Sequence, residues 1–240
     1  MKINVHAGHN PDGKVACGAV GLIRESTQAR IITSKLILLL EKRGHTVYNC
    51  TVDDGSSQSN VLSKIIQKCN SHNVDLDISI HFNAGANAYT QNKITTGTEC
   101  YVFRKGSMAD VYATKICENI SKLGYKNRGV KVGKDLYFLN TTKAEAILVE
   151  CCFVDDGDDI RLYDANSMAH AIASAIDPDI DAKDGNSVEE STILVNGQGV
   201  PVRRILKDGT NYIAIRDIAT ALDYEITNQG SIAVLIKKEG

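Results

Sequence analysis

Residues 146–152 read Ala-Ile-Leu-Val-Glu-Cys-Cys, the most apolar strand-like run of the chain. A short, nearly continuous apolar run predicts a strand that is buried on both faces of a parallel sheet. Its one acid, Glu150, needs an explanation. Burying an ionised carboxylate among apolar side chains is costly unless the carboxylate has a partner or its pKa rises. A buried carboxyl group with a raised pKa suits a general acid/base near neutral pH.

Strand-like and helix-like segments alternate through the first three quarters of the chain. Apolar residues at helical spacing indicate the helices, and short apolar runs indicate the strands. The predicted strands are residues 3–5, 46–50, 76–82, 97–103 and 146–152, and the predicted helices are residues 26–43, 57–71, 108–123 and 159–175. This alternation predicts an α/β fold, an open and mostly parallel sheet with helices on both faces.

The composition changes after residue 176. Residues 177–190 are acidic and rich in turn-forming residues, which predicts a linker between a domain at 1–176 and a small module at 191–240. Short apolar runs separated by Asn-Gly and Asp-Gly turns make the module β-rich, with one short helix at 216–222. A module of this size has a marginal core, so we expect it to use a partner surface, for example in a homodimer.

Composition excludes several classes of function. The formal net charge is -2, and no run of Lys and Arg resembles a phosphate-binding stripe, so no nucleic-acid partner is expected. No apolar stretch approaches the roughly 18 residues of a membrane span, so no membrane insertion is expected. A strand is predicted directly after Met1-Lys2, and no secretory signal precedes it, so synthesis without a signal peptide in the cytoplasm is expected.

The cysteines do not form a recognisable framework. There are seven of them, an odd number, and no two are spaced as CxxC. This pattern favours reduced, buried thiols that pack in the core over disulfides or a cysteine-rich zinc site.

Four residues have the chemistry of a catalytic zinc site, which needs three protein ligands, an open position and a nearby proton carrier. His9 follows the first strand, Glu25 begins the first helix, His81 ends a buried strand and Glu150 lies in another. Strand ends of an α/β sheet can bring them together. Each has an ordinary alternative: a loop histidine, an acid favoured by the helix dipole, or a satisfied histidine at a strand end. Glu150 is the hardest to explain without function.

Several motifs in order along the chain resemble the zinc-dependent N-acetylmuramoyl-L-alanine amidases. They are residues 5–10 (VHAGHN), 18–21 (GAVG) with Glu25, 79–84 (SIHFNA), 97–102 (GTECYV), 128–131 (RGVK), 136–139 (LYFL) and 146–153 (AILVECCF). The resemblance covers residues 2 to about 175. It implies an open α/β sheet, zinc (Zn2+) held by His9, Glu25 and His81, and Glu150 as the catalytic acid/base.

Two positions depart from the family pattern. His6 stands where Asp is common, and Glu145 stands where Pro is common. We expect His6 to support the ligands from behind rather than to compete with them, because three ligands already complete the set. Asn83 and Arg128, which lie within or beside the motifs, are expected to orient the substrate.

The resemblance implies cleavage of the amide bond between N-acetylmuramic acid and L-alanine in bacterial peptidoglycan. A phage endolysin made in the host cytoplasm and acting on the cell wall is the expected role, and a bacterial autolysin is its alternative. A zinc peptidase that cuts the stem peptide and a non-catalytic wall-binding protein remain open as other functions.

The C-terminal module resembles the small stalk domain first named from the N-termini of copper amine oxidases. The resemblance lies in residues 193–197, 212–219, 221–224 and 232–234. The module has neither His nor Cys, so copper is not expected. Attachment to the cell wall is the favoured role, and dimerisation or passive spacing are the others.

Overall fold

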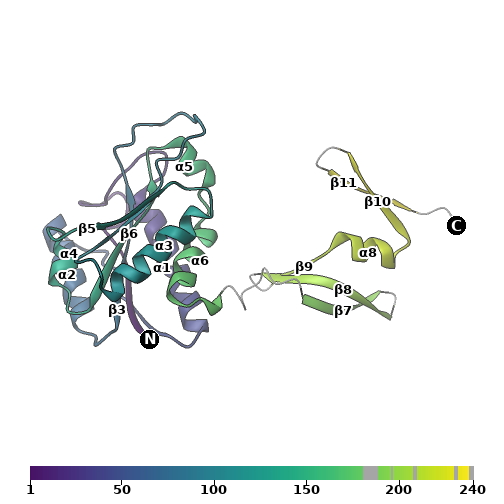
Figure 1. The fold of residues 1–240 in the computed structure, drawn as a ribbon, viewed down its shortest axis with the longest axis horizontal. Coiled ribbons are helices and arrows are strands. Elements are labelled where there is room, and N and C mark those ends of the chain that lie inside the picture. Colours follow the sequence, from purple (N-terminus) through teal and green to yellow (C-terminus); the bar gives the residue numbers. More distant parts are fainter. Residues whose placement is uncertain (181–188, 196, 208–209, 230–231, 238–240) are drawn as a thin grey trace. The chain divides into compact units, whose positions relative to one another are not determined.

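The structure is a computed structural model that describes residues 1–180, 189–195, 197–207, 210–229 and 232–237. The chain divides into two compact units, Met1–Pro178 and Asp179–Gly240 (Figure 1).

A six-stranded sheet forms the centre of the first unit. The strands are β1 (Lys2–Ala7), β2 (Thr46–Asn49), β3 (Leu76–Asn83), β4 (Thr98–Val102), β5 (Asn127–Val132) and β6 (Glu145–Phe153), in the order β2-β1-β3-β6-β4-β5. β2, β1, β3 and β6 are parallel to one another. β4 pairs antiparallel with β6 and parallel with β5. The predicted α/β fold with a mostly parallel sheet is confirmed, and the reversal between β6 and β4 is a feature that the sequence pattern did not indicate.

Helices cover both faces of this sheet (Figure 1). They are α1 (Glu25–Lys42), α2 (Gln58–Asn70), α3 (Met108–Ser121), α4 (Tyr137–Thr141), α5 (Gly157–Leu162) and α6 (Ala165–Ile176). α6 packs against both α1 and α3, and α2 packs against α4. Ile78 of β3 and Ile147 of β6 are fully buried in the middle of the sheet. Because helices cover both faces of the sheet, these two strands are rich in apolar residues.

The predicted closing helix at 159–175 is wrong as a single helix. The chain forms α5 and α6 instead, with an interruption at Tyr163 and Asp164. Asp164 has an extended backbone, and its side chain accepts a hydrogen bond from the backbone N–H of Ser167, which makes it the N-cap of a new helix. The strand β5 and the helix α4 were not predicted. β5 is a largely exposed edge strand without an apolar run, and α4 has only five residues, too few to show a helical pattern.

The second unit is small and β-rich, as predicted. β7 (Glu189–Val195), β8 (Gln198–Lys207) and β9 (Thr210–Ile213) form an antiparallel sheet, and β10 (Tyr224–Gln229) pairs with β11 (Ile232–Lys237). The helix α8 (Ile215–Ala221) lies between the two sheets in sequence. Much of the predicted linker (181–188) and the turn positions Asn196 and 208–209 lie outside the described residues.

All seven cysteines are free thiols, and six of them are buried, in agreement with a packing role. Among the helices of the described residues, none combines the length and the hydropathy that crossing a membrane requires.

Candidate functional site

The structure brings His9, Glu25 and His81 together from three distant parts of the sequence. His9 lies in the loop after β1, Glu25 is the first residue of α1, and His81 lies near the end of β3. Glu25 Oε1 is 3.3 Å from His9 Nε2 and 3.0 Å from His81 Nδ1. One ligand atom from each residue lies within 4.8 Å of the others, and within the described ranges this is the one group of three or more such side chains.

Glu25 is fixed in place by backbone donors as well as by the two histidines. Its Oε2 accepts a hydrogen bond from the N–H of Ala19 at 2.7 Å, and its Oε1 accepts one from the N–H of Phe82 at 3.1 Å. Burial raises the pKa of this carboxyl, but the hydrogen bonds to His81 and His9 lower it further, so its net pKa lies well below the usual range. Glu25 is therefore an ionised, buried carboxylate, and a helix-dipole role alone does not account for it.

Two glycines give the three side chains their room. A Cβ at Gly8 would overlap the imidazole ring of His81. A Cβ at Gly18 would meet the Glu25 carboxylate and the His9 ring, and Gly18 also has a φ of +81°, which favours glycine. Gly8 and Gly18 are thus required by the packing of these three side chains.

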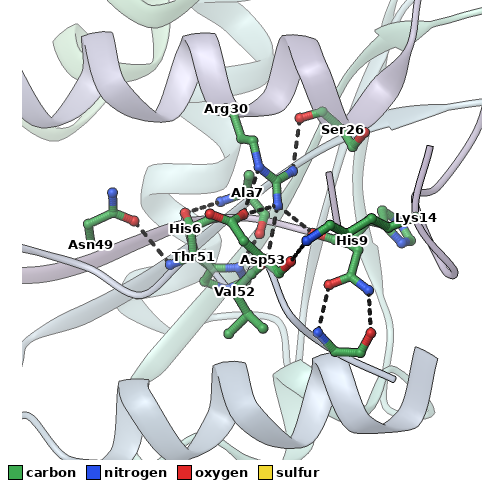
Figure 2. A network of polar contacts seen from close by, with 12 residues as sticks. His6, Ala7, His9, Lys14, Ser26, Arg30, Asn49, Thr51, Val52 and Asp53 are labelled. Atoms are coloured by element: carbon green, nitrogen blue, oxygen red, sulfur yellow. Dashed lines mark hydrogen bonds and ion pairs between the residues drawn. The ribbon is translucent and has the colours of Figure 1, made fainter. Parts of the chain in front are cut away.

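Arg30 of α1 holds the backbone of the His9 loop (Figure 2). Its guanidinium donates to the carbonyls of His9 and Val52, each at 3.0 Å, and pairs with Asp53 at 2.6 Å. His9 has a positive φ of 61°, which is uncommon for a residue other than glycine. The sequence did not single out Arg30, and a cation on the first helix gives no signal of this role.

Two of the separations between the candidate ligand atoms are close to those of a tetrahedral metal site. Zinc bonds to His nitrogen and carboxylate oxygen are about 2.0–2.1 Å long, which places two ligand atoms of a tetrahedron roughly 3.3–3.4 Å apart. The 3.0 Å and 3.3 Å separations around Glu25 Oε1 are close to this value. The donor set of two imidazoles and one carboxylate leaves a fourth position open, so these residues could hold a catalytic metal ion.

Glu150 lies next to this cluster. On β6 it is in register with His81 of β3 on one side and with Glu99 of β4 on the other, so the three side chains emerge on the same face of the sheet. Its Oε2 is buried and has no hydrogen-bond partner among the described residues. Burial, followed by the charges of Glu25 and Glu99, raises the pKa of Glu150 to about 8, while Lys131 opposes the shift.

Glu99, which the sequence did not single out, organises the neighbouring side chains. It is 1% exposed. Its Oε2 contacts Arg128 Nε at 2.6 Å and Lys131 Nζ at 2.5 Å, and its Oε1 accepts from Asn83 and Tyr101. Asn83 and Arg128, expected to orient substrate, therefore both bond to Glu99. Glu99 is an acid inside the predicted strand at 97–103, and this was the signal that could have identified it.

His6 and Glu145 stay outside the site. The His6 ring is buried, has its Nδ1 3.2 Å from the carbonyl of Ala7 and packs edge-on against Phe138. Burial, with a smaller effect of His81, lowers its pKa to about 3. The expectation that His6 supports the ligands is not met by any hydrogen bond to them among the described residues. Glu145 pairs with Arg104 at 2.9 Å on the surface.

An acidic segment holds the loop that follows β3. Asp155 accepts hydrogen bonds from the backbone N–H groups of 85–87, and Asp158 accepts from those of 92–94. Asp156 and Asp159 accept from the backbone of Thr96 and Gly97. These aspartates are buried although their sequence resembles a solvated run of charge. They fix a loop of the chain next to Asn83.

Comparisons with known proteins agree on one family. The family model of the N-acetylmuramoyl-L-alanine amidases matches residues 3–181. An uncharacterised protein of Clostridium perfringens is 37% identical over 164 residues, which are 68% of this chain and 47% of that protein. The endolysin of Bacillus phage SPP1 is 30% identical over 173 residues, which are 70% of this chain and 60% of that protein. The chain spans about half the length of these curated relatives.

Solved structures show the same fold. The catalytic domain of the CD27L endolysin targeting Clostridia difficile has a TM-score of 0.65 at 27% identity and covers 73% of this chain and 96% of that domain. The catalytic domain of CwlV, an N-acetylmuramoyl-L-alanine amidase from Bacillus (Paenibacillus) polymyxa, has a TM-score of 0.60 at 22% identity and covers 76% of this chain and all of that domain (100%). The second likeness concerns the fold alone.

Proposed function

The chain belongs to the N-acetylmuramoyl-L-alanine amidase family, and on this premise we propose that it hydrolyses the amide bond between N-acetylmuramic acid and L-alanine in bacterial peptidoglycan. In this proposal His9, Glu25 and His81 hold zinc, and Glu150 is the general acid/base. The observation that carries this proposal is that His81 and Glu150 lie opposite each other on adjacent strands, beside the Glu25 carboxylate, which contacts both His9 and His81.

Zinc held by His9, Glu25 and His81 would supply Lewis-acid chemistry, that is, polarisation of the scissile carbonyl and a lower pKa of water. Glu25, His9 and His81 would each turn one ligand atom toward the zinc, and the backbone N–H groups of Ala19 and Phe82 hold the Glu25 carboxylate in place. Glu150 accepts the proton of the attacking water on its unpartnered Oε2 and returns it to the departing amine of L-alanine. Buried apolar residues, Val149 and Cys151, flank Glu150 on its strand.

The substitution Glu150→Gln tests the catalytic assignment. It keeps the shape of the side chain but removes its ability to accept a proton, so we expect zinc to remain bound and turnover to fall by at least about 100-fold. The matched control is Glu145→Gln on the same strand, where the carboxylate serves a surface ion pair. Turbidity loss of cell walls and the newly freed amino groups of L-alanine are the readouts. Wild-type turnover by Glu150→Gln would remove this residue from the mechanism.

The same assay separates the amidase from the other functions. Lysis that stops with a chelator, returns with zinc and frees L-alanine amines supports the amidase. Metal-dependent release of other amino groups would indicate a peptidase of the stem peptide. Stoichiometric zinc without hydrolysis of any wall would indicate a binding protein.

We further propose a phage endolysin as the biological role, with a bacterial autolysin as the alternative. In this proposal the chain consists of a catalytic domain at 1–176, a linker at 177–190 and a small module at 191–240 that attaches the enzyme to the wall. The described part of this module has a small core, in which Val202 and Ala219 are buried, and homodimerisation is the second candidate role. Co-sedimentation with walls, with and without residues 179–240, tests attachment, and equal binding by both forms would contradict it.

A further inference from the structure

Two cations stand beside the proposed catalytic carboxylate. His81, Glu150 and Glu99 occupy one row across β3, β6 and β4. The register between β4 and β5 shifts so that Glu99 lies opposite Arg128 and Gly129, which extends this row to a cationic side chain on the edge strand. Lys131 of the same strand reaches the same carboxylate.

Buried groups hold both cations. Glu99, which is 1% exposed, contacts the Arg128 Nε and Lys131 Nζ atoms. The Arg128 guanidinium also lies 5.0 Å from the ring centroid of Phe153, and Lys131 Nζ lies 5.6 Å from that of Tyr101. Two cations that a buried carboxylate and aromatic rings hold in place are already ordered. Binding of a ligand would therefore cost little of the side-chain entropy of Arg128 and Lys131.

The pair has binding capacity that Glu99 does not use. One carboxylate neutralises one of the two positive charges. Arg128 bonds to Glu99 through Nε, and its two terminal Nη groups make no hydrogen bond to the described residues. The side chains of Arg128 and Lys131 are 30% and 40% exposed, respectively, so solvent and ligands can reach them. A guanidinium fork and an ammonium together are a typical receptor for a carboxylate.

We propose that Arg128 and Lys131 bind a carboxylate of the peptide on the leaving-group side of the scissile amide, and that this carboxylate belongs to the second residue of the stem peptide. This inference rests on the proposed function. The glycan side offers no such group, because the lactyl carboxyl of muramic acid is consumed in the scissile amide. Hence the anion comes from the peptide.

The spacing of the strands fits this residue. Neighbouring strands lie about 4.8 Å apart, so β5 is roughly 10 Å from the strand of Glu150. The two cations reach back toward Glu99, which shortens this span. An extended peptide covers about 3.5 Å per residue, so a carboxylate within two residues of the reacting bond can reach the pair.

The alternative is that Arg128 and Lys131 merely neutralise Glu99. The test uses two N-acetylmuramoyl tripeptides that are identical except that the second residue carries a free α-carboxylate in one and a carboxamide in the other. For the wild-type chain we expect kcat/KM to favour the carboxylate by about tenfold or more, mainly through KM. In Arg128→Gln and in Lys131→Gln this ratio should fall toward one.

Two further variants complete the test. Arg128→Lys keeps the charge and should retain part of the preference, whereas Arg104→Gln, which removes an exposed cation paired with Glu145, should keep the wild-type ratio. Because the ratio is taken within one preparation, partial misfolding of a variant does not change it. Equal hydrolysis of both substrates by the wild type, or an unchanged ratio in both Gln variants, would overturn the carboxylate site while the amidase stands. Hydrolysis of neither substrate would overturn the proposed function and this inference with it.

Discussion

The substitution Gly8→Ala is expected to damage the proposed zinc site by displacing His81, one of its proposed ligands. A Cβ at this position would lie 2.7 Å from His81 Nδ1 and closer still to two other atoms of the ring, whereas ordinary contacts begin at 3.4 Å. The ring must therefore retreat by more than 0.7 Å, the difference between 3.4 and 2.7. Metal–ligand distances tolerate deviations of about 0.2 Å, so His81 loses its bonding position.

The expected loss of zinc affinity is about 10- to 100-fold or more. Changing the groups that orient a metal ligand typically costs 10- to 100-fold, and this substitution displaces the ligand itself. Crowding should also cost about 1–3 kcal/mol of unfolding free energy. A competition titration against a chromophoric chelator measures the zinc affinity, and urea unfolding of the metal-free chain measures the stability.

Gly13→Ala is the matched control. Gly13 lies in the same loop and has a φ of +79°, but a Cβ there would meet nothing within 4 Å. We expect it to lose about 1 kcal/mol through backbone strain and to bind zinc like the wild type. If Gly8→Ala bound zinc as tightly as Gly13→Ala does, the assignment of His81 as a crowded ligand would be refuted.

Two predictions concern stability. Asp158→Ala removes the carboxylate that accepts hydrogen bonds from three backbone N–H groups at 92–94. Hydrogen exchange of these amides should therefore accelerate, and the unfolding free energy should fall by about 2–4 kcal/mol. Unchanged protection of the amides would contradict the anchoring role of Asp158. Burial raises the pKa of Asp77 from 3.8 to about 6, against an opposing hydrogen bond from Asn4. The folded state therefore binds more protons between these pH values, and this group's contribution to stability should decline by about 2 kcal/mol as the pH rises from 4 to 6. Asp77→Asn should remove that decline in urea titrations across this range, and an unaltered pH profile would count against the raised pKa.

Local sequence patterns were sufficient for the α/β architecture, whereas the roles of the four candidate residues came from the resemblance to a known family. Hydrophobic periodicity is a property of neighbouring residues, so the buried runs around Ile78 and Ile147 predicted central strands that the structure confirms. The closing helix was wrong because a single capping side chain, that of Asp164, ends one helix and begins another within an otherwise helical pattern.

The sequence by itself thus determined most of the strands and helices, without β5, α4 and the division between α5 and α6, and it marked Glu150 as an acid within an apolar strand in need of a function. Only the tertiary structure decided which side chains share the site: the contact of Glu25 with both histidines, the antiparallel pairing that sets Glu99 beside Glu150, and the attachment of Arg128 to Glu99. The physical reason is strand register. Sequence periodicity assigns a residue to a face of the sheet, whereas the order and register of strands far apart in the chain decide which residues on that face become neighbours.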